Sequence, residues 1–233
     1  MTPPYLVKTQ EIILTDTNRT IAVLGGTGHE GSGLAFRWAH HGYRVIIGSR
    51  TPEKAENTAR ELNALLGRDA VLGMGNVEAA ARADIVVLSV PYAAHRATLE
   101  SIYEAVQGKV LVDVTVPIKP PITVVSLPEG RTAAEEAQAF LGEGVKVVSA
   151  FQNVSATHLK DLSHPIDCDV LVSGDDAEAK ALTIELVEAA GMRGIDAGPL
   201  ANAIVAESLT PLLLGINKRY GIRGAGIRIT GIQ

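Results

Sequence analysis

The sequence has little cysteine, little net charge and no long hydrophobic run, and each shortage excludes a class of protein. Cys168 is the single cysteine among 233 residues, so no intramolecular disulfide can form. This suits a reducing compartment, and we expect a cytoplasmic protein. The formal net charge of −5 is mild, which argues against nucleic acid as a partner. No apolar run reaches the roughly 20 residues that span a bilayer, so we expect no membrane partner either.

Motifs for covalent or metal-dependent catalysis are also missing. The sequence contains no cluster with metal-ligand spacing and no nucleophile elbow, so we expect no metal. No partner pattern surrounds Cys168, which we therefore expect to be a small buried side chain and not a nucleophile. Residues 1–19 lack the apolar core of a signal peptide and are interpreted as an N-terminal extension.

What the sequence does contain is an alternation of strand and helix patterns. Short β-branched runs predict strands over 20–24, 43–47, 70–74, 84–90, 109–114, 145–149, 169–173 and 192–196. Apolar residues at helical spacing predict helices over 29–41, 52–66, 76–83, 94–106, 133–141 and 177–189, and a buried helix over 200–220. Thr132 and Glu135 have the spacing of a capping box. The pattern predicts an α/β protein with a Rossmann-type, doubly wound, mostly parallel sheet and a small C-terminal α/β lobe.

A glycine-rich turn stands between the first strand and the first helix. Gly26, Gly28 and Gly31 fit the dinucleotide fingerprint G-x-G-x-x-G in its required strand–turn–helix context. Such glycines allow the tight turn, the close approach of a pyrophosphate and the packing of the helix on its strand. The phosphates then meet free N–H groups at a helix N-terminus. The alternative is a purely structural turn.

The end of the second strand decides the cofactor. Enzymes that use NAD place a carboxylate there for the ribose 2′-hydroxyl. This chain has Ser49 and Arg50, with Lys54 one helical turn further on. A hydroxyl, a guanidinium and an ammonium suit a 2′-phosphate, so the sequence predicts NADP. The alternative is that Arg50 and Lys54 are solvated surface charges.

Several further polar residues have competing interpretations. His95 follows the fourth predicted strand and is a possible cofactor contact, although it could equally be structural. Asp175 and Asp176 resemble catalytic carboxylates but fit the N-cap of the helix that follows. Residues 115–130 are proline-rich and irregular, which is typical of a functional or a disordered segment. The glycine-rich tail 221–233 is expected to be a loop over the site.

Taken together, these motifs resemble those of the F420-dependent NADP oxidoreductases. The resemblance is carried by residues 24–28, 48–56, 84–91, 146–150 and 174–176, and most distinctively by residues 196–200 and 207–212. It covers nearly everything from residue 20 to about residue 229. It implies a hydride exchange between NADP(H) and the 8-hydroxy-5-deazaflavin coenzyme F420, and a homodimer. The domains expected are the N-terminal extension 1–19, an NADP-binding Rossmann domain 20–149 and a smaller lobe 150–233 that completes the deazaflavin site.

The resemblance also implies site residues. Contacts to NADP are expected from Gly26, Thr27, Gly28, His29, Glu30, Ser49, Arg50, Lys54, Val90, Pro91, Tyr92 and Ala150. Contacts to the deazaflavin are expected from Phe151, Gln152, Asn153, Val154, Ser208 and Thr210. Ser208 and Thr210 could instead bond the local backbone beside Pro211. Relatives have histidine where this chain has Gln152, which can still bond a ring carbonyl but cannot titrate.

The expected chemistry belongs to the two small molecules. Hydride would pass between nicotinamide C4 and deazaflavin C5, so the protein would mainly position the rings and exclude water. No catalytic side chain is therefore expected. Two rival functions remain open, an NADPH-dependent flavin or ferric-chelate reductase and a non-catalytic NADP-sensing protein.

Overall fold

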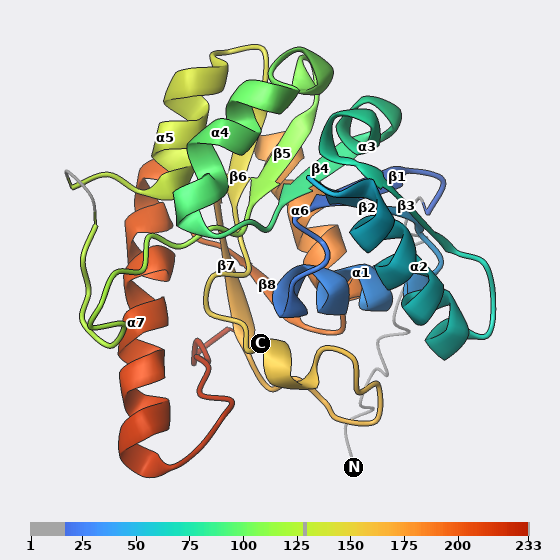
Figure 1. Ribbon diagram of the computed structural model, residues 1–233. Coiled ribbons are helices and arrows are strands. Elements are labelled where there is room, and N and C mark those ends of the chain that lie inside the picture. Colours follow the sequence, from blue (N-terminus) through green and yellow to red (C-terminus); the bar gives the residue numbers. More distant parts are fainter. Residues whose placement is uncertain (1–16, 128–129, 233) are drawn as a thin grey trace, which may run out of the picture.

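A computed structural model describes residues 17–127 and 130–232 of the chain (Figure 1). Its strands are β1 (Thr20–Leu24), β2 (Arg44–Ser49), β3 (Val71–Gly75), β4 (Ile85–Leu88), β5 (Val110–Asp113), β6 (Lys146–Ser149), β7 (Asp169–Gly174) and β8 (Arg193–Asp196). Its helices are α1 (His29–His41), α2 (Pro52–Leu66), α3 (Asn76–Arg82), α4 (Tyr92–Ile102), α5 (Ala133–Leu141), α6 (Ala177–Ala189) and α7 (Ala203–Tyr220). Short 3₁₀ helices are η1 (Glu104–Val106), η3 (Ala156–His158) and η4 (Leu200–Asn202).

The strands form one sheet in the order β3-β2-β1-β4-β5-β6-β7-β8. All pairs from β3 to β6 are parallel, β7 is antiparallel to β6, and β8 is parallel to β7. Strand order reverses between β1 and β4, which is where doubly wound sheets bind ligands beyond the carboxyl ends of their strands. The predicted mostly parallel, doubly wound α/β fold is confirmed.

Helices cover both faces of the sheet, because the strands are apolar on both sides. Ile21 and Val23 of β1 pack in a core with α1, α2 and α6, whereas Ala22 and Leu24 pack in a second core with α3, α4 and α5. This double burial explains why the strands read as continuous apolar runs and not as alternating ones.

Most predicted elements are correct to within one or two residues, and helices with clear end signals have the predicted bounds. Thr132 accepts from the N–H of Glu135 while Glu135 bonds back to Thr132, as the capping-box spacing predicts. Asp176 accepts from the N–H of Ala179 and caps α6, so its N-cap interpretation is confirmed. The helix predicted over 94–106 instead begins at Tyr92, because Pro91 is the N-cap, and ends at Ile102 before the separate turn η1.

The helix predicted over 200–220 is present, but the prediction that it is buried is wrong for part of its surface. The segment is the turn η4 followed by α7, and Ile204, Val205 and Leu212 of α7 are exposed at 42, 52 and 51%. By length and composition alone, residues 200–220 would suffice to cross a membrane, a test that core helices of soluble proteins also pass. The exposed side chains leave one face of α7 unpartnered in the described chain.

The division into two domains at residue 149 stays a prediction, and residues 1–16 of the expected extension lie outside the described part. The pairing of β6 with β7 joins the two expected domains, and one apolar core contains residues from both.

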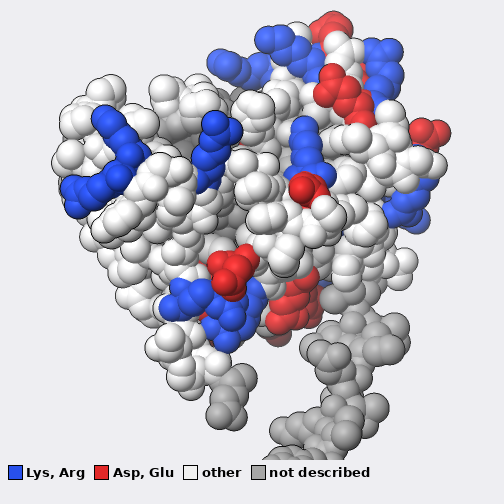
Figure 2. Space-filling view, turned by 90° about the horizontal axis from the view of Figure 1, so that it is seen from below, with Lys and Arg blue, Asp and Glu red and all other residues white. Residues whose placement is uncertain are grey.

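On the face in Figure 2, acidic and basic side chains lie in small groups separated by wide uncharged areas.

Candidate functional site

Two cavities adjoin at the carboxyl ends of the parallel strands. The first, of about 290 Å³, lies between the glycine turn, the end of β2 and the start of α4. The second, of about 330 Å³, lies between the start of α1, the segment after β5, residues 151–154 and α7. Gly28, Ser89, Val90 and Pro91 line both, so one extended molecule could occupy the two.

The glycines of the turn differ in whether the surrounding protein leaves room for a side chain. A Cβ on Gly26 would lie 2.6 Å from the Val23 carbonyl oxygen, and a Cβ on Gly31 would lie 2.9 Å from the Gly26 Cα. Both glycines are therefore required by the protein's own packing. A Cβ on Gly28 would meet only the Gly25 carbonyl oxygen, at an ordinary 3.5 Å. Gly28 thus leaves open space in the wall of both cavities.

This open space lies at the N-terminus of α1. Gly28 is the N-cap, without a capping side chain, and the chain enters the helix at His29. The first N–H groups of a helix have no intrahelical acceptor, and the helix dipole places partial positive charge there. The start of α1 can therefore bind an anion such as a pyrophosphate.

Three residues with hydrogen-bond donors surround the outer part of the first cavity. Ser49, Arg50 and Lys54 all line it, from the end of β2 and the first turn of α2. Ser49 is buried, and its hydroxyl oxygen accepts from the Thr51 N–H at 3.1 Å, which leaves the hydroxyl hydrogen available to an anion. Thr51 occupies the predicted N-cap position of α2, but its side chain makes no capping bond. The geometry provides two positive charges and one hydroxyl for a phosphate.

Residues 151–154 form one wall of the second cavity in a strained turn. Phe151 has a φ of 74°, which is unusual for a residue with a side chain, and its ring packs edge-on against Trp38 at 5.7 Å. Gln152 is buried, and its Nε2 donates to the Asp113 carbonyl at 2.7 Å. The Thr210 hydroxyl donates to the Gln152 carbonyl at 2.6 Å, so α7 holds this turn. The alternative interpretation, in which the Thr210 hydroxyl bonds to the backbone of its own helix, is therefore wrong.

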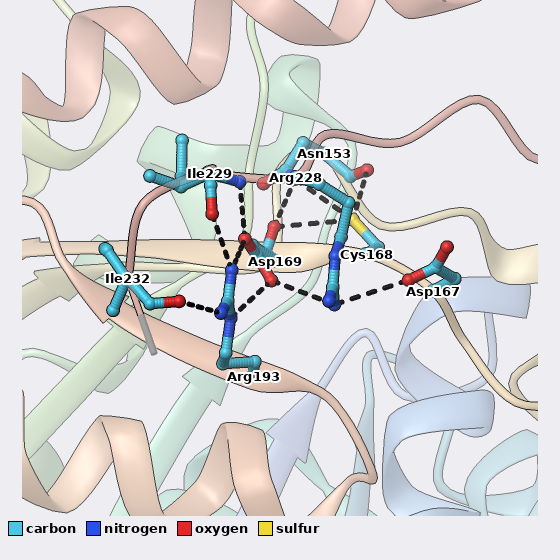
Figure 3. Close-up of polar contacts among 8 residues, drawn as sticks. All are labelled: Asn153, Asp167, Cys168, Asp169, Arg193, Arg228, Ile229 and Ile232. Carbon is cyan, nitrogen blue, oxygen red and sulfur yellow. Dashed lines mark hydrogen bonds and ion pairs between the residues drawn. The ribbon is translucent and has the colours of Figure 1, made fainter.

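The same turn is held from behind by a polar cluster at the start of β7 (Figure 3). Asn153 donates to the Asp169 carbonyl at 2.8 Å. The fully buried Asp169 carboxylate accepts from Arg193, at 2.5 and 2.9 Å, and from the Ile229 N–H at 2.6 Å. The hydrogen bond from Arg193 lowers the pKa of Asp169. The cluster connects the C-terminal tail to the back of the turn. None of the described residues 221–232 lines either cavity, so the expectation that this tail forms a loop over the site is wrong.

His95 makes a structural pair beside the two cavities. Its Nε2 lies 2.7 Å from the Asp113 Oδ2, and both side chains are buried. Burial opposes protonation, but the hydrogen bond and charge of Asp113 and the charge of Glu136 outweigh it, so the pKa of His95 is raised. His95 lines neither cavity, and its pairing with Asp113 favours the structural interpretation. Its partner Asp113 fixes the segment after β5 by accepting from the Thr115 N–H at 2.9 Å.

Two glutamates near the second cavity have strongly raised pKa values. Burial raises the pKa of Glu30, in the cavity wall, to about 8. Burial likewise raises the pKa of Glu207 on α7 to about 8, although Glu207 accepts from the N–H groups of Ala133 and Ala134, at 2.8 and 3.2 Å. Both carboxyl groups are therefore mostly uncharged at neutral pH.

The structure brings most of the predicted site residues together. The cavity walls include Thr27, Gly28, His29, Glu30, Ser49, Arg50, Lys54, Val90, Pro91, Phe151, Gln152, Val154 and Thr210. Five predicted residues line neither cavity: Gly26, Tyr92, Ala150, Asn153 and Ser208. Tyr92 bonds to Glu136 with its hydroxyl, and the Asn153 side chain bonds to the Asp169 carbonyl behind the turn.

Sequence reasoning missed other lining residues. Asn76 and Thr115 line the cavities from the positions just after β3 and β5. Their place after parallel strands was a usable signal, since ligands bind beyond the carboxyl ends. Within residues 17–127 and 130–232, no group of three or more potential ligands could hold a metal ion.

A cavity of about 900 Å³, larger than either of these two, lies elsewhere. Its walls include Thr20, Tyr43 and Arg44, at the opposite ends of β1 and β2. Parallel sheets bind their ligands at carboxyl ends, so size alone does not make this cavity the functional site.

Known proteins with similar sequences identify the family. Residues 20–117 match the family described as "NADP oxidoreductase coenzyme F420-dependent". The F420-dependent NADP reductase of Methanothermobacter thermautotrophicus is 48% identical over 221 residues, covering 91% of this chain and 95% of the relative. The F420-dependent NADP reductase of Methanocaldococcus jannaschii is 43% identical over 222 residues, which cover 91% of this chain and 99% of the relative.

A solved structure agrees with the fold. A crystal structure from Arthrobacter sp. FB24, described as a candidate F420-dependent NADP reductase, superposes with a TM-score of 0.77. It is 29% identical and covers 91% of this chain and all of its own. The identity to the two archaeal enzymes, over nearly the full length of both partners, settles the family: the chain belongs to the F420-dependent NADP reductases.

Proposed function

We propose that the chain transfers a hydride between NADP(H) and coenzyme F420. The observation that carries the proposal is the pair of adjoining cavities, one built for phosphates and one with an apolar and amide wall. The family membership supplies the identity of the two reactants. When bound, the nicotinamide and the deazaflavin supply the hydride chemistry, and the protein's residues bind, orient and enclose them.

The first cavity would bind the adenosine end of NADP. Ser49, Arg50 and Lys54 would hold the 2′-phosphate, and the N–H groups at the start of α1 would hold the pyrophosphate. The lack of a carboxylate after β2 favours NADP over NAD, since a carboxylate would repel the extra phosphate. Val90 and Pro91, shared by both cavities, would border the nicotinamide ribose.

The second cavity would hold the deazaflavin against the nicotinamide. Phe151, Gln152, Val154 and Thr210 form its far wall. The Gln152 Nε2 already donates to Asp113, while its Oε1 is buried with no partner in the described chain. A ring N–H could therefore be bound there. Asn153, Ser208, Tyr92 and Ala150 would act by shaping the walls and not by direct contact.

One assay separates this function from its rivals. The purified protein is mixed with NADPH and, in turn, with oxidised F420, FMN and a ferric chelate. Reduction of F420 alone supports the proposal, whereas reduction of FMN or ferric iron alone supports the rival reductase. Reduction of none of the three supports an NADP-sensing protein. NADH in place of NADPH tests the cofactor assignment.

We also infer a homodimer that uses α7. Ile204, Val205 and Leu212 of α7 are exposed, as are Ile122 and Val124 of the neighbouring segment 115–127. A Cβ on Gly215 of α7 would lie 3.5 Å from the Thr123 Cβ, and Figure 1 shows the segment running beside the helix. Exposed apolar side chains on two neighbouring segments support an interface here.

Light scattering after gel filtration tests the homodimer. The protein is expected to have twice the chain mass, and Val205→Glu with Leu212→Glu is expected to give monomers. Leu72→Glu, at a similarly exposed position on β3, is the matched control and should leave the mass unchanged. A monomeric parent protein would contradict the inference. The protein is further proposed to be cytoplasmic, without membrane or nucleic-acid partners, which cell fractionation tests.

A further inference from the structure

Glu30 lies at the start of α1 in the wall of the second cavity, and one of its carboxyl oxygens is buried without a partner. Its Oε1 is buried and has no hydrogen-bond partner among residues 17–127 and 130–232. The Oε1 of Gln152, in the same cavity wall, is in the same condition. A buried acceptor without a donor loses its hydrogen bonds to water without replacing them, which is unfavourable. Two such acceptors in one wall indicate a ligand that brings N–H groups.

The charge of Glu30 restricts which ligand this can be. The start of α1 is the anion-binding end of the helix, two residues from Gly28. A negatively charged Glu30 would repel a pyrophosphate bound there. An uncharged carboxylic acid does not, and it presents an O–H donor beside a C=O acceptor.

An amide edge is the complement of an uncharged acid. It presents a C=O acceptor beside an N–H donor, so the two groups can form a pair of parallel hydrogen bonds. Both rings of the proposed reaction carry such an edge, the carboxamide of nicotinamide and the pyrimidine ring of the deazaflavin.

Resting on the proposed function, we propose that Glu30 is a positioning residue that, in its uncharged form, hydrogen-bonds the amide edge of a bound ring in the second cavity. The O–H donates to the ring's carbonyl oxygen, and Oε1 accepts from its N–H. Glu30 thus fixes the rotation of that ring relative to the second one. It takes no part in the hydride transfer itself.

The protonation of Glu30 follows from its surroundings. Burial raises its pKa to about 8. His29, which is exposed, is the other titratable residue in the described cavity wall. Behind the wall lie the paired His95 and Asp113, and Glu207 on α7. A bound pyrophosphate adds negative charge near Glu30, which favours the proton further.

Ring binding is therefore linked to a proton. Below about pH 8, Glu30 already holds the proton, so binding changes nothing. Above that pH, the free protein has lost the proton and must take one up on binding. Affinity for the ring is expected to fall by up to tenfold per pH unit there.

The test measures binding and proton uptake by isothermal titration calorimetry at pH 7 and pH 9, in buffers of different ionisation enthalpy. The ligands are NADP⁺, 2′-phospho-ADP-ribose, which lacks the nicotinamide, and F420 alone. The variants are Glu30→Gln, which keeps a donor beside an acceptor without titrating, and Glu30→Met, which removes both. Glu61→Gln, at an exposed position on α2, is the control.

The Met variant is expected to bind one ring ligand about tenfold more weakly at pH 7, while 2′-phospho-ADP-ribose is unaffected. Weakened NADP⁺ identifies the carboxamide, and weakened F420 identifies the deazaflavin edge. The Gln variant is expected to bind as the parent protein does at pH 7 and to take up no proton at pH 9. Unchanged binding of both rings by the Met variant would overturn the proposal, as would an equal loss for 2′-phospho-ADP-ribose. If the parent protein does not bind F420 at all, the proposed function fails while the carboxamide result still decides the role of Glu30.

Discussion

Replacing two glycines of the same turn by alanine is expected to impair different properties, stability for Gly31→Ala and NADP⁺ binding for Gly28→Ala. Gly31→Ala should destabilise the protein, because its Cβ would lie 2.9 Å from the Gly26 Cα and 3.2 Å from the Gly25 carbonyl oxygen. Gly28→Ala should leave stability almost unchanged, because its Cβ would meet one atom at an ordinary 3.5 Å. Only the second substitution places a methyl group where a pyrophosphate is proposed to approach.

The magnitudes follow from these distances. Backbone atoms cannot move aside as a flexible side chain could, so the Gly31→Ala contact should cost about 1–3 kcal/mol of unfolding free energy. For a chain of this length, each kcal/mol lowers Tm by about 2–4 °C. Gly28→Ala should change stability by less than about 0.5 kcal/mol. Its NADP⁺ affinity should fall by at least about tenfold, or 1.4 kcal/mol.

Thermal unfolding and calorimetric titration with NADP⁺ measure both quantities on the same samples. The expected pattern is a stable, weakly binding Gly28→Ala and a less stable Gly31→Ala. If Gly28→Ala binds NADP⁺ as tightly as the parent protein, no phosphate lies against Gly28 and the assignment of the first cavity is wrong. If Gly31→Ala is as stable as the parent, the packing argument is wrong.

Three further outcomes are expected. Arg50→Glu should reverse the preference for NADPH over NADH, measured as the ratio of the two kcat/KM values; an intact preference would refute the 2′-phosphate assignment. Because the pKa of Glu207 is about 8 when folded and near 4.5 when unfolded, the folded state holds the extra proton between these values, so stability should fall as pH rises from 4.5 to 8. Glu207→Gln should flatten that dependence in urea titrations, and an unchanged slope would contradict it. Asp169→Asn should lower Tm and expose the tail to protease, because Arg193 and the Ile229 N–H lose their shared carboxylate; a tail as resistant as in the parent protein would show that the cluster is not its anchor.

The first cavity could be predicted from sequence because its parts are local. The glycine turn, the end of β2 and the start of α2 each follow a strand directly, and apolar runs locate strands well. The sequence therefore predicts Ser49, Arg50 and Lys54 without long-range packing, and all three line the first cavity.

The rest depends on which way side chains point, which periodicity does not encode. His95 is held by Asp113, a partner from the next strand, and lines neither cavity. Asn153 bonds to Asp169 behind the turn, and Ser208 lies on α7 outside both walls. The sequence predicts a buried helix for the partly exposed α7 because exposed apolar side chains at helical spacing have the same sequence pattern as core residues.

Isotope transfer tests the proposed hydride exchange between the two rings. The protein is given oxidised F420 and NADPH that carries deuterium at the transferable position of nicotinamide C4. The deuterium content of the reduced deazaflavin is then measured by mass spectrometry. Direct transfer within adjoining cavities predicts one deuterium at C5 of the reduced deazaflavin and none in the water. Reduced F420 without deuterium, or NADPH left unoxidised in the presence of F420, would contradict it.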